Sequence, residues 1–475
     1  MTTANETIEP RRALALDALR GIAILLMVFS GRIPYGTLPD WMYHAQVPPP
    51  NHVFNPNLPG ITWVDLVFPF FLFAMGAAIP LALSRRIERK ESMASIVLSV
   101  FLRGLLLASF ALYVMHIRPW LFGARPSSGA WMFSLGGFLL LFPMYAQLPS
   151  QWTRWLRWTV RGGGWICAIA LMAFMKLPDG SGFLVTRSDI IILVLSNVAV
   201  AGALLWLVTR ENWILRLGFL GILIAVRVSA PVDGWVHWLW NISPAPWLFR
   251  VYFLQYLFLV LPGTIAGDML IKWMKAGRSS ETNPSWTASA SAMAAFLMVM
   301  ITVVVVVGLK ARWVVGAGVG TIVLLTASWY LVRKAVTSTE VLIRTLLQWG
   351  AFWIVLGLVF EPFEGGIKKD HPTMSYYFVT AGLSIIVLIA LTIAIDVLHQ
   401  KKFLSFFVLT GQNPLVAYAG IHSLVPPVLG LVGLDTIIES ITPTPWLGVL
   451  RGAFMTYLVA IAAVACTKRK ILLKT

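Results

Sequence analysis

Charged residues are scarce in this chain. They make up 12% of its 475 residues, whereas 58% of the residues are hydrophobic and the mean hydropathy is +0.79. A soluble domain averages about 25% charged residues. Since so few charges cannot cover the water-facing surface of a soluble protein of this length, the composition predicts an integral membrane protein.

Cysteine and the common catalytic motifs are also scarce or absent. The two cysteines, Cys167 and Cys466, lie in apolar stretches, which excludes a disulfide framework. No Cys/His cluster has metal-ligand spacing, so we expect no metal site. No Gly-x-Ser-x-Gly elbow occurs, and the glycine-rich run 316–320 lacks the Lys-Ser/Thr of a phosphate-binding loop. Its small residues favour close helix packing instead.

Long runs of apolar residues make up most of the sequence. A spanning helix needs roughly 20 mostly apolar residues, and about fourteen runs approach this length. We therefore predict an all-α polytopic membrane protein with about 11–14 transmembrane helices. The candidate spans are 13–34, 61–84, 94–115, 131–148, 165–181, 189–209, 213–229, 250–271, 287–309, 313–333, 341–360, 374–398, 403–430 and 446–466.

The net charge of +17 comes from basic residues in short segments between the spans. We interpret it as a topology signal, not as a nucleic-acid-binding surface. All the basic clusters fall on one side of the membrane if the first helix begins inside, so the positive-inside rule predicts cytoplasmic termini. The clusters are Arg85 to Lys90, Arg154 to Arg161, Lys272 to Arg278, Lys401 with Lys402, and Lys468 to Lys470.

The domain organisation is simple. We expect a cytoplasmic tail over 1–12, one transmembrane domain over 13–466 and a basic cytoplasmic tail over 467–475. The partner of most of this surface would be a lipid bilayer. The expected location is a bacterial inner membrane, since there is no long luminal domain or organelle signal.

Ionisable residues inside predicted spans are functional candidates because burying a charge in a bilayer costs about 2.5–3.5 kcal/mol on insertion scales. Asp17 and Arg20 have the i, i+3 spacing of a pair on one helix face, which also fits a structural ion pair. Asp396 lies near the inner end of its span. The run Gly411-Gln412-Asn413-Pro414 interrupts another span, and such a break typically lines a cavity.

Asp65 begins the second span, at its outer end, after a loop that contains His44 and His52. A carboxylate at a helix N-terminus can be a simple helix-start residue. A carboxylate beside a histidine is also the simplest general-base arrangement, because it orients the ring and stabilises its protonated form. A histidine in an interface loop can equally be a solvated side chain.

Two blocks of residues resemble the heparan-α-glucosaminide N-acetyltransferase family. The first block is Leu16-Asp17-Ala18-Leu19-Arg20-Gly21, the pair His44-Ala45, and the run from Thr62 to Phe71. The second contains Ile367-Lys368-Lys369, Met374-Ser375-Tyr376, Ile395-Asp396-Val397 and Gly411-Gln412-Asn413-Pro414 with Tyr418. No motif of the family is found between about 120 and 340.

The resemblance implies a multi-spanning acyltransferase. It would move an acetyl group from cytoplasmic acetyl-CoA to an amine or hydroxyl of a sugar or glycan at the outer side. The family's active-site histidine corresponds to His44 by the His-Ala match. Extra residues in the loop, 47–50 and 55–59, leave His52 as an alternative.

The chemistry suggests roles for other residues. A neutral imidazole suits proton removal from the acceptor, and a transient acyl-histidine is the alternative. Asp65 would orient the imidazole, and Asn413 could donate a hydrogen bond to the thioester or to the pantetheine amides. Arg85, Arg86 or Arg103 could hold the phosphates of CoA, although Arg85 and Arg86 are also what the topology rule requires.

Two other functions compete with this one. A secondary transporter or glycolipid flippase fits the number of spans and the interrupted helix, but the sequence lacks the two symmetric halves typical of such proteins. A non-catalytic membrane scaffold would use the intramembrane polar residues as structural pairs. A homo-oligomer is compatible with each of these functions.

Overall fold

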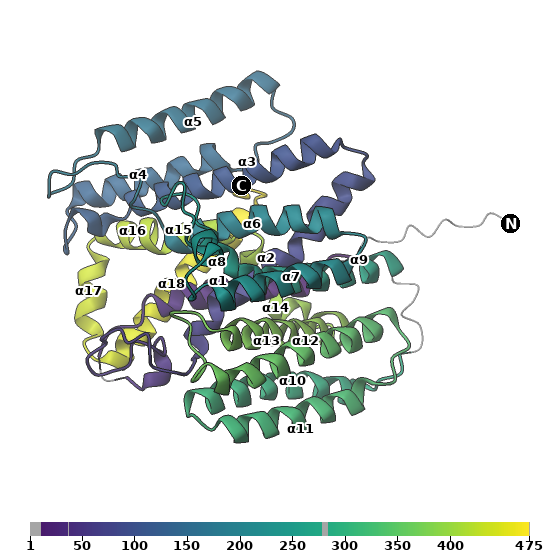
Figure 1. The fold of residues 1–475 in the computed structure, drawn as a ribbon. Helices are drawn as coiled ribbons and strands as arrows, with labels where there is room; N and C mark the ends of the chain where they lie inside the picture. Colours follow the sequence, from purple (N-terminus) through teal and green to yellow (C-terminus); the bar gives the residue numbers. More distant parts are fainter. Residues whose placement is uncertain (1–10, 37, 278–283, 475) are drawn as a thin grey trace.

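The computed structural model describes residues 11–36, 38–277 and 284–474, and this part of the chain is helical, with two isolated bridges and no strand (Figure 1). The first half contains α1 (Leu14–Ser30), η1 (Asp40–Met42), α2 (Trp63–Glu88), α3 (Met93–His116), η2 (Pro119–Phe122), α4 (Ser128–Tyr145), α5 (Arg154–Phe174), α6 (Ile190–Thr209), α7 (Trp213–Ser229) and α8 (Trp235–Asn241). The second half contains η3 (Val251–Tyr256), α9 (Leu257–Ala276), α10 (Ala288–Lys310), α11 (Val314–Val332), α12 (Ser338–Phe363), α13 (Met374–Thr392), η5 (Ile393–Val397), α14 (Lys401–Gly411), α15 (Pro414–Ser423), α16 (Val425–Leu431), α17 (Leu434–Ile441) and α18 (Pro445–Lys468).

Within the described residues, 11 helical segments are long and apolar enough to cross a membrane, which confirms the all-α polytopic fold and the predicted range. Two further predicted spans form helices of 17 residues, α1 and α7. These two helices account for most of the difference between the 11 helical segments that could span a membrane and the larger number of spans predicted from the sequence. The side on which the termini lie stays a prediction. Residues 1–10 of the predicted tail, and Arg278 of one basic cluster, lie outside the described residues.

Two predicted segments differ from the observed helices. The span expected at 165–181 is a helix that begins eleven residues earlier, at Arg154, so Arg154, Arg157 and Arg161 are helical and not in a loop. Arg161 donates to the carbonyls of Met144 and Ala146 at the end of α4, which fixes the start of α5 against its neighbour. The run 403–430 is divided into α14, α15 and α16 by turns before Pro414 and after Ser423.

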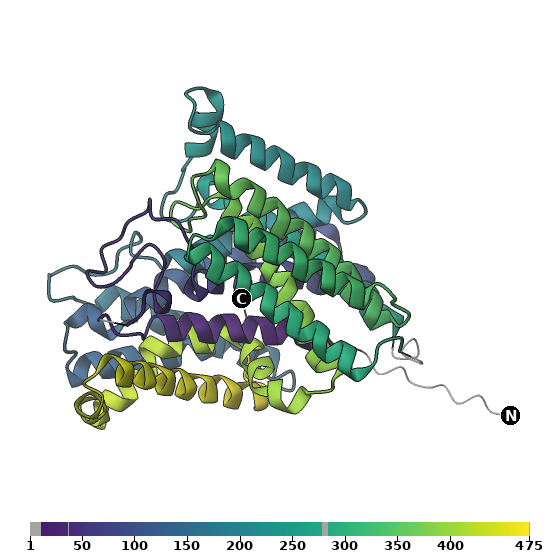
Figure 2. The same cartoon turned by 90° about the horizontal axis from the view of Figure 1, so that it is seen from below.

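The centre of the bundle is formed by α2 and α13, in each of which 83% of the spanning window is buried. The corresponding share is 22% in α11 and α18, whose apolar side chains therefore face outward as lipid-exposed surface. Figures 1 and 2 show α10 and α11 on the rim of the bundle. The central position of α2 and α13 matters because both helices begin at the candidate site.

Small residues allow several helices to approach closely. A Cβ added at Gly76 of α2 would lie 2.3 Å from the carbonyl oxygen of Val260 in α9, and one at Gly263 would lie 2.4 Å from that of Phe73. The run 316–320 packs through Ala317, whose Cβ lies 2.4 Å from the position of a Cβ at Gly308. Gly318 has nothing within 4 Å of its Cβ position. The packing expected from this run is therefore made by part of it only.

Several helix ends come together at one end of the bundle. Lys275, at the end of α9, pairs with Glu88 at the end of α2 at 2.8 Å. Arg11, before α1, donates to Ser338 at the start of α12 at 2.8 Å. The basic residues that follow α2 and those that end α9 thus share one end, as the topology prediction requires.

Candidate active site

Asp65 is fixed by the start of α2. Thr62 is the N-cap of this helix, and Asp65 closes a capping box by accepting the Thr62 backbone N–H at 2.9 Å. The same oxygen, Oδ2, accepts the backbone N–H of Ala45 at 3.2 Å. The residue is fully buried, and its second oxygen, Oδ1, has no hydrogen-bond partner.

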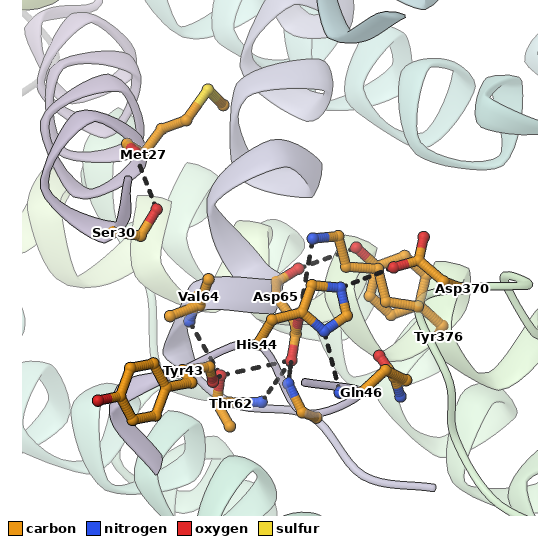
Figure 3. Close-up of polar contacts among 12 residues, drawn as sticks. Met27, Ser30, Tyr43, His44, Gln46, Thr62, Val64, Asp65, Asp370 and Tyr376 are labelled. Carbon is orange, nitrogen blue, oxygen red and sulfur yellow. Dashed lines mark hydrogen bonds and ion pairs between the residues drawn. The ribbon is translucent and has the colours of Figure 1, made fainter. Parts of the chain in front are cut away.

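The loop from α1 to α2 returns His44 to this carboxylate (Figure 3). Nδ1 of His44 lies 3.4 Å from Oδ1 of Asp65 and accepts the backbone N–H of Gln46 at 3.0 Å. Nε2 lies 2.7 Å from Oδ2 of Asp370. The side chain of His44 is 18% exposed. His44 is thus held between two carboxylates, one at each nitrogen.

Asp370 belongs to the loop that joins α12 to α13, which several contacts hold against α2. The N–H of Gly60 donates to the carbonyl of Ile367 at 2.7 Å, and the hydroxyl of Tyr376 donates to the carbonyl of Asp65 at 2.9 Å. From α7, Arg227 donates to the carbonyl of Pro372 at 2.9 Å. These contacts hold the loop that carries Asp370 against the first loop, α2 and α7.

Glu364 fixes the other side of this loop by accepting the first backbone N–H groups of α13, those of Met374 and Ser375, at 2.6 and 2.8 Å. Lys369 lies 3.7 Å from Oδ1 of Asp65. The site therefore joins residues of both sequence blocks that carry the family resemblance.

The electrostatics of the site keep Asp370 ionised beside the ring of His44. Burial raises the pKa of Asp370, but the hydrogen bond with His44 and the charge of Lys369 outweigh it and lower the pKa below its usual value. Asp370 is therefore ionised at neutral pH. Because Gln46 donates to Nδ1, the neutral ring carries its hydrogen on Nε2 and donates it to Asp370. Such a ring can act as a proton acceptor whose charged form is stabilised by both carboxylates.

His52 lies elsewhere in the loop. Its Nε2 contacts the backbone of Gly36, and its ring packs edge-on against Tyr35 and Tyr43 with centroids 4.7 and 4.5 Å away. No contact joins it to Asp65. Although His52 is closer to Asp65 in sequence, the geometry brings His44 to the carboxylate.

The arginines expected to hold a nucleotide do not line the large cavity at the inner end of α2, although Arg85 and Arg86 are next in sequence to its lining residues Ser84 and Ile87. Arg85 is exposed at the end of α2, and Arg86 pairs with Glu91 at 2.6 Å. Arg103 is half-buried in α3. The cavity, about 1250 Å³, lies between α2, α6, α7, α9 and α12. Its lining includes Trp206, Arg210, Asp268, Lys272, Trp273 and Gln348.

Asn413 and the residues beside it hold the helix break together. The Asn413 amide is fully buried, donates to the carbonyl of Ile471 at 2.8 Å and accepts the N–H of Leu473 at 3.1 Å. The break lines none of the cavities described in this article. Its contacts tie the C-terminal segment to the bundle.

Asp17 and Arg20 form the expected i, i+3 pair, at 3.4 Å. Gln412 donates to Asp17 and Arg20 donates to the carbonyl of Gly411, so this pair links α1 to the break. Asp396 lies in the single π-helical turn η5 that follows α13. All three residues belong to the end of the bundle opposite His44.

Sequence reasoning missed Asp370 and the part played by Tyr376. Both lie in the segment 367–376, part of the second block that resembles the family, where Asp370 is the one acidic residue. That block was the available signal, but nothing local linked it to His44, which is 326 residues away in the chain. Among the described residues no group of three or more His, Cys, Asp or Glu side chains could hold a metal ion.

Comparison with known proteins places these observations in a family. The family model described as "Domain of unknown function (DUF5009)" matches residues 12–270, more than half of the chain. Human heparan-alpha-glucosaminide N-acetyltransferase is 28% identical over 196 residues, which cover 36% of this chain and 28% of the relative. The matched part thus spans less than a third of that protein, an acetyltransferase by name. The chain belongs to the DUF5009 family and is similar to this N-acetyltransferase.

Proposed function

We propose that this protein is a membrane acetyltransferase that moves an acetyl group from acetyl-CoA to an amine or hydroxyl of a sugar or glycan at the outer end of the bundle. The observation that carries the proposal is the position of His44, with Asp370 2.7 Å from Nε2 and Asp65 3.4 Å from Nδ1. The similarity to an acetyltransferase supports the reaction class.

The reaction needs one base. The acceptor nitrogen or oxygen attacks the thioester carbonyl, the carbon–sulfur bond breaks, CoA leaves as the thiolate, and the proton of the acceptor passes to His44. General-base catalysis of this kind contributes about 10²–10⁴-fold. In the alternative route His44 attacks the thioester first and carries the acetyl group as an acyl-imidazole before the acceptor takes it.

The large cavity between α2, α9 and α12 is our candidate for the nucleotide end of the donor. Its tryptophans, Trp206 and Trp273, offer flat apolar surfaces, and Lys272 offers a positive charge for a phosphate. The inner part of α2 lines this cavity through Ser84, while Asp65 begins the same helix at the active site. Roughly 28 Å of helix separates the two residues, so the donor's flexible arm would lie along α2.

Replacing His44 tests the proposal. We expect His44→Ala to reduce acetyl transfer to glucosamine by about 100-fold or more, because the base is lost. His52→Ala is the matched control, since it removes a histidine from the same loop without touching Asp65, and should keep transfer within about threefold. The assay measures CoA release and acetylated product with purified protein in liposomes. Wild-type turnover by His44→Ala would refute the role of His44.

Donor binding separates a lost base from a lost fold. His44→Ala should still show the upward shift in melting temperature that acetyl-CoA gives the wild-type protein, as any ligand of the folded state does. A radiolabelled acetyl group that stays on the wild-type chain without acceptor would indicate the acyl-histidine route. If acetyl-CoA gives no shift and no transfer, a transporter or flippase becomes the better reading of this bundle.

A further inference from the structure

A second cavity lies on the other side of α1 from the His44 site. Its volume is about 360 Å³, and it is bounded by the end of α1, the loop after α3, the start of α6 and α15. Met27, Val28 and Gly31 of α1 and its C-cap form one wall, whereas Phe29 points the other way and stacks on Trp63 of α2 at 5.8 Å. Six polar side chains line the cavity: Arg32, Arg118, Ser188, Asp189, Tyr418 and His422.

The two arginines are held by their outer nitrogens only. Arg32 donates through Nη2 to the carbonyl of Ile421, and its guanidinium lies 5.1 Å from the ring centroid of Trp120. Nη2 of Arg118 pairs with Asp189 at 2.8 Å. The Nε atom of each arginine is buried and has no hydrogen-bond partner. Two buried donors thus remain unsatisfied at this cavity, which is costly unless a ligand supplies acceptors.

The charge balance of the cavity is positive. Asp189 is the one acidic side chain in the lining, and its Oδ1 already caps α6 by accepting the N–H groups of Ile191 and Ile192. Burial, followed by the charges of Arg118 and Arg451, lowers the pKa of Arg32 to about 10. Like charges at close range create a potential that an anion would relieve.

We propose that this cavity is an oxyanion-binding site, in which Arg32 and Arg118 hold a phosphate, sulfate or carboxylate group presented at the outer end of the bundle. Planar guanidinium groups match such anions in geometry and charge. The volume accommodates the anionic group of a sugar derivative or the headgroup of a lipid. The site does not depend on acetyl transfer, because α1 separates it from His44.

The experiment measures ligand binding to the full-length protein in a neutral detergent. The probes are inorganic phosphate, glucose 6-phosphate as a soluble anionic sugar, and phosphatidylglycerol in mixed micelles. Glucose and the neutral lipid monoolein serve as uncharged controls. We expect an anionic probe to raise the melting temperature and its matched neutral control to leave it unchanged. Glucose 6-phosphate alone would identify a soluble source of the anion, and phosphatidylglycerol alone a lipid source.

Substitutions test the residues. Arg32→Lys and Arg118→Lys each keep a positive charge but lose the planar fork and Nε, so we expect each to weaken binding at least tenfold. Arg250→Lys is the control, since Arg250 contacts the carbonyl of Pro246 and does not line the cavity, and it should change binding less than twofold.

The wild-type measurements stand even if a variant does not fold. The proposal is overturned if none of the anionic probes stabilises the wild-type protein more than its neutral control. It is also overturned if folded Arg32→Lys and Arg118→Lys proteins bind the probe as the wild type does.

Discussion

Asp65 divides its two carboxylate oxygens between two tasks. Oδ2 accepts the backbone N–H groups that begin α2 and fix the loop at Ala45, whereas Oδ1 faces the ring of His44. Asp370 has a single partner in the site, Nε2 of His44, apart from the charge of Lys369. Substitutions of the two aspartates should therefore differ in their effects.

Asp370→Asn should reduce turnover by about 100-fold while leaving the melting temperature nearly unchanged, because Asp370 is 42% exposed and the asparagine oxygen can still accept from Nε2 but carries no charge to stabilise a protonated ring. Asp65→Asn should destabilise the protein by about 1–3 kcal/mol, since it disturbs buried backbone hydrogen bonds, and should retain part of the activity. Paired activity and thermal-unfolding measurements distinguish the two. Equal losses of stability in both variants would contradict this division.

The lowered pKa of Asp370 predicts how the stability of the protein depends on pH. Because the folded state lowers it below the usual 3.8, the stability that the ionised carboxylate contributes is complete above about pH 4 and is lost as the pH falls through the lowered value. The stability that Asp370 adds to the wild type relative to Asp370→Asn should therefore shrink as the pH falls from about 5 towards 3, as thermal unfolding would show. A difference that does not change over that range would assign the titration to another group.

Sequence predicted part of this site. His44 and Asp65 lie 21 residues apart, one in the loop and the other at the start of the helix that follows it, so their types and spacing pointed to each other. Asp370 could not be found in the same way, because only the packing of α13 against α2 brings it to His44. Asn413 looked like a ligand-binding amide, yet its hydrogen bonds go to the C-terminal segment, whose path no local pattern reveals.

At the scale of single elements, the hydropathy of the sequence predicts the apolar helices correctly, but it places the start of an amphipathic helix wrongly. The arginines of α5 resemble a loop when only hydropathy is considered, whereas they occupy the first turns of a helix. The hydropathy of the run 403–430 does not show that it forms three helices. The division depends on a tertiary contact, because Gly411 at the end of α14 packs against α1. A Cβ at Gly411 would lie 1.9 Å from the carbonyl oxygen of Asp17.

Gly411→Ala should consequently destabilise the protein by about 1–3 kcal/mol, because α14 would be pushed away from α1. Gly318→Ala in α11 is the control: nothing lies within 4 Å of its Cβ position, and alanine favours the helix. Thermal unfolding in one detergent compares the two variants. If both have the same melting temperature, the close contact between α1 and α14 is not important for stability.

At the scale of the whole molecule, the distribution of basic residues predicts how the protein is oriented in the membrane. The basic clusters predict that the loop with His44 faces outward and that the basic C-terminal segment faces inward. In a background with Cys167 and Cys466 replaced by Ser, Val53→Cys should react with a membrane-impermeant maleimide in intact cells. Val53 is 68% exposed. Lys468→Cys should react only after permeabilisation, and the reverse pattern would invert the topology.

The long sequence separation between His44 and Asp370 has a consequence for how the protein is made. Asp370 follows His44 by 326 residues, so at the usual pace of about 5–20 residues per second the ribosome needs roughly 15–65 s to supply it. During that interval the growing chain holds His44 and Asp65 without their third member. The histidine gains its second carboxylate only when α12 and α13 have entered the membrane, so the reactive constellation is completed late in biogenesis.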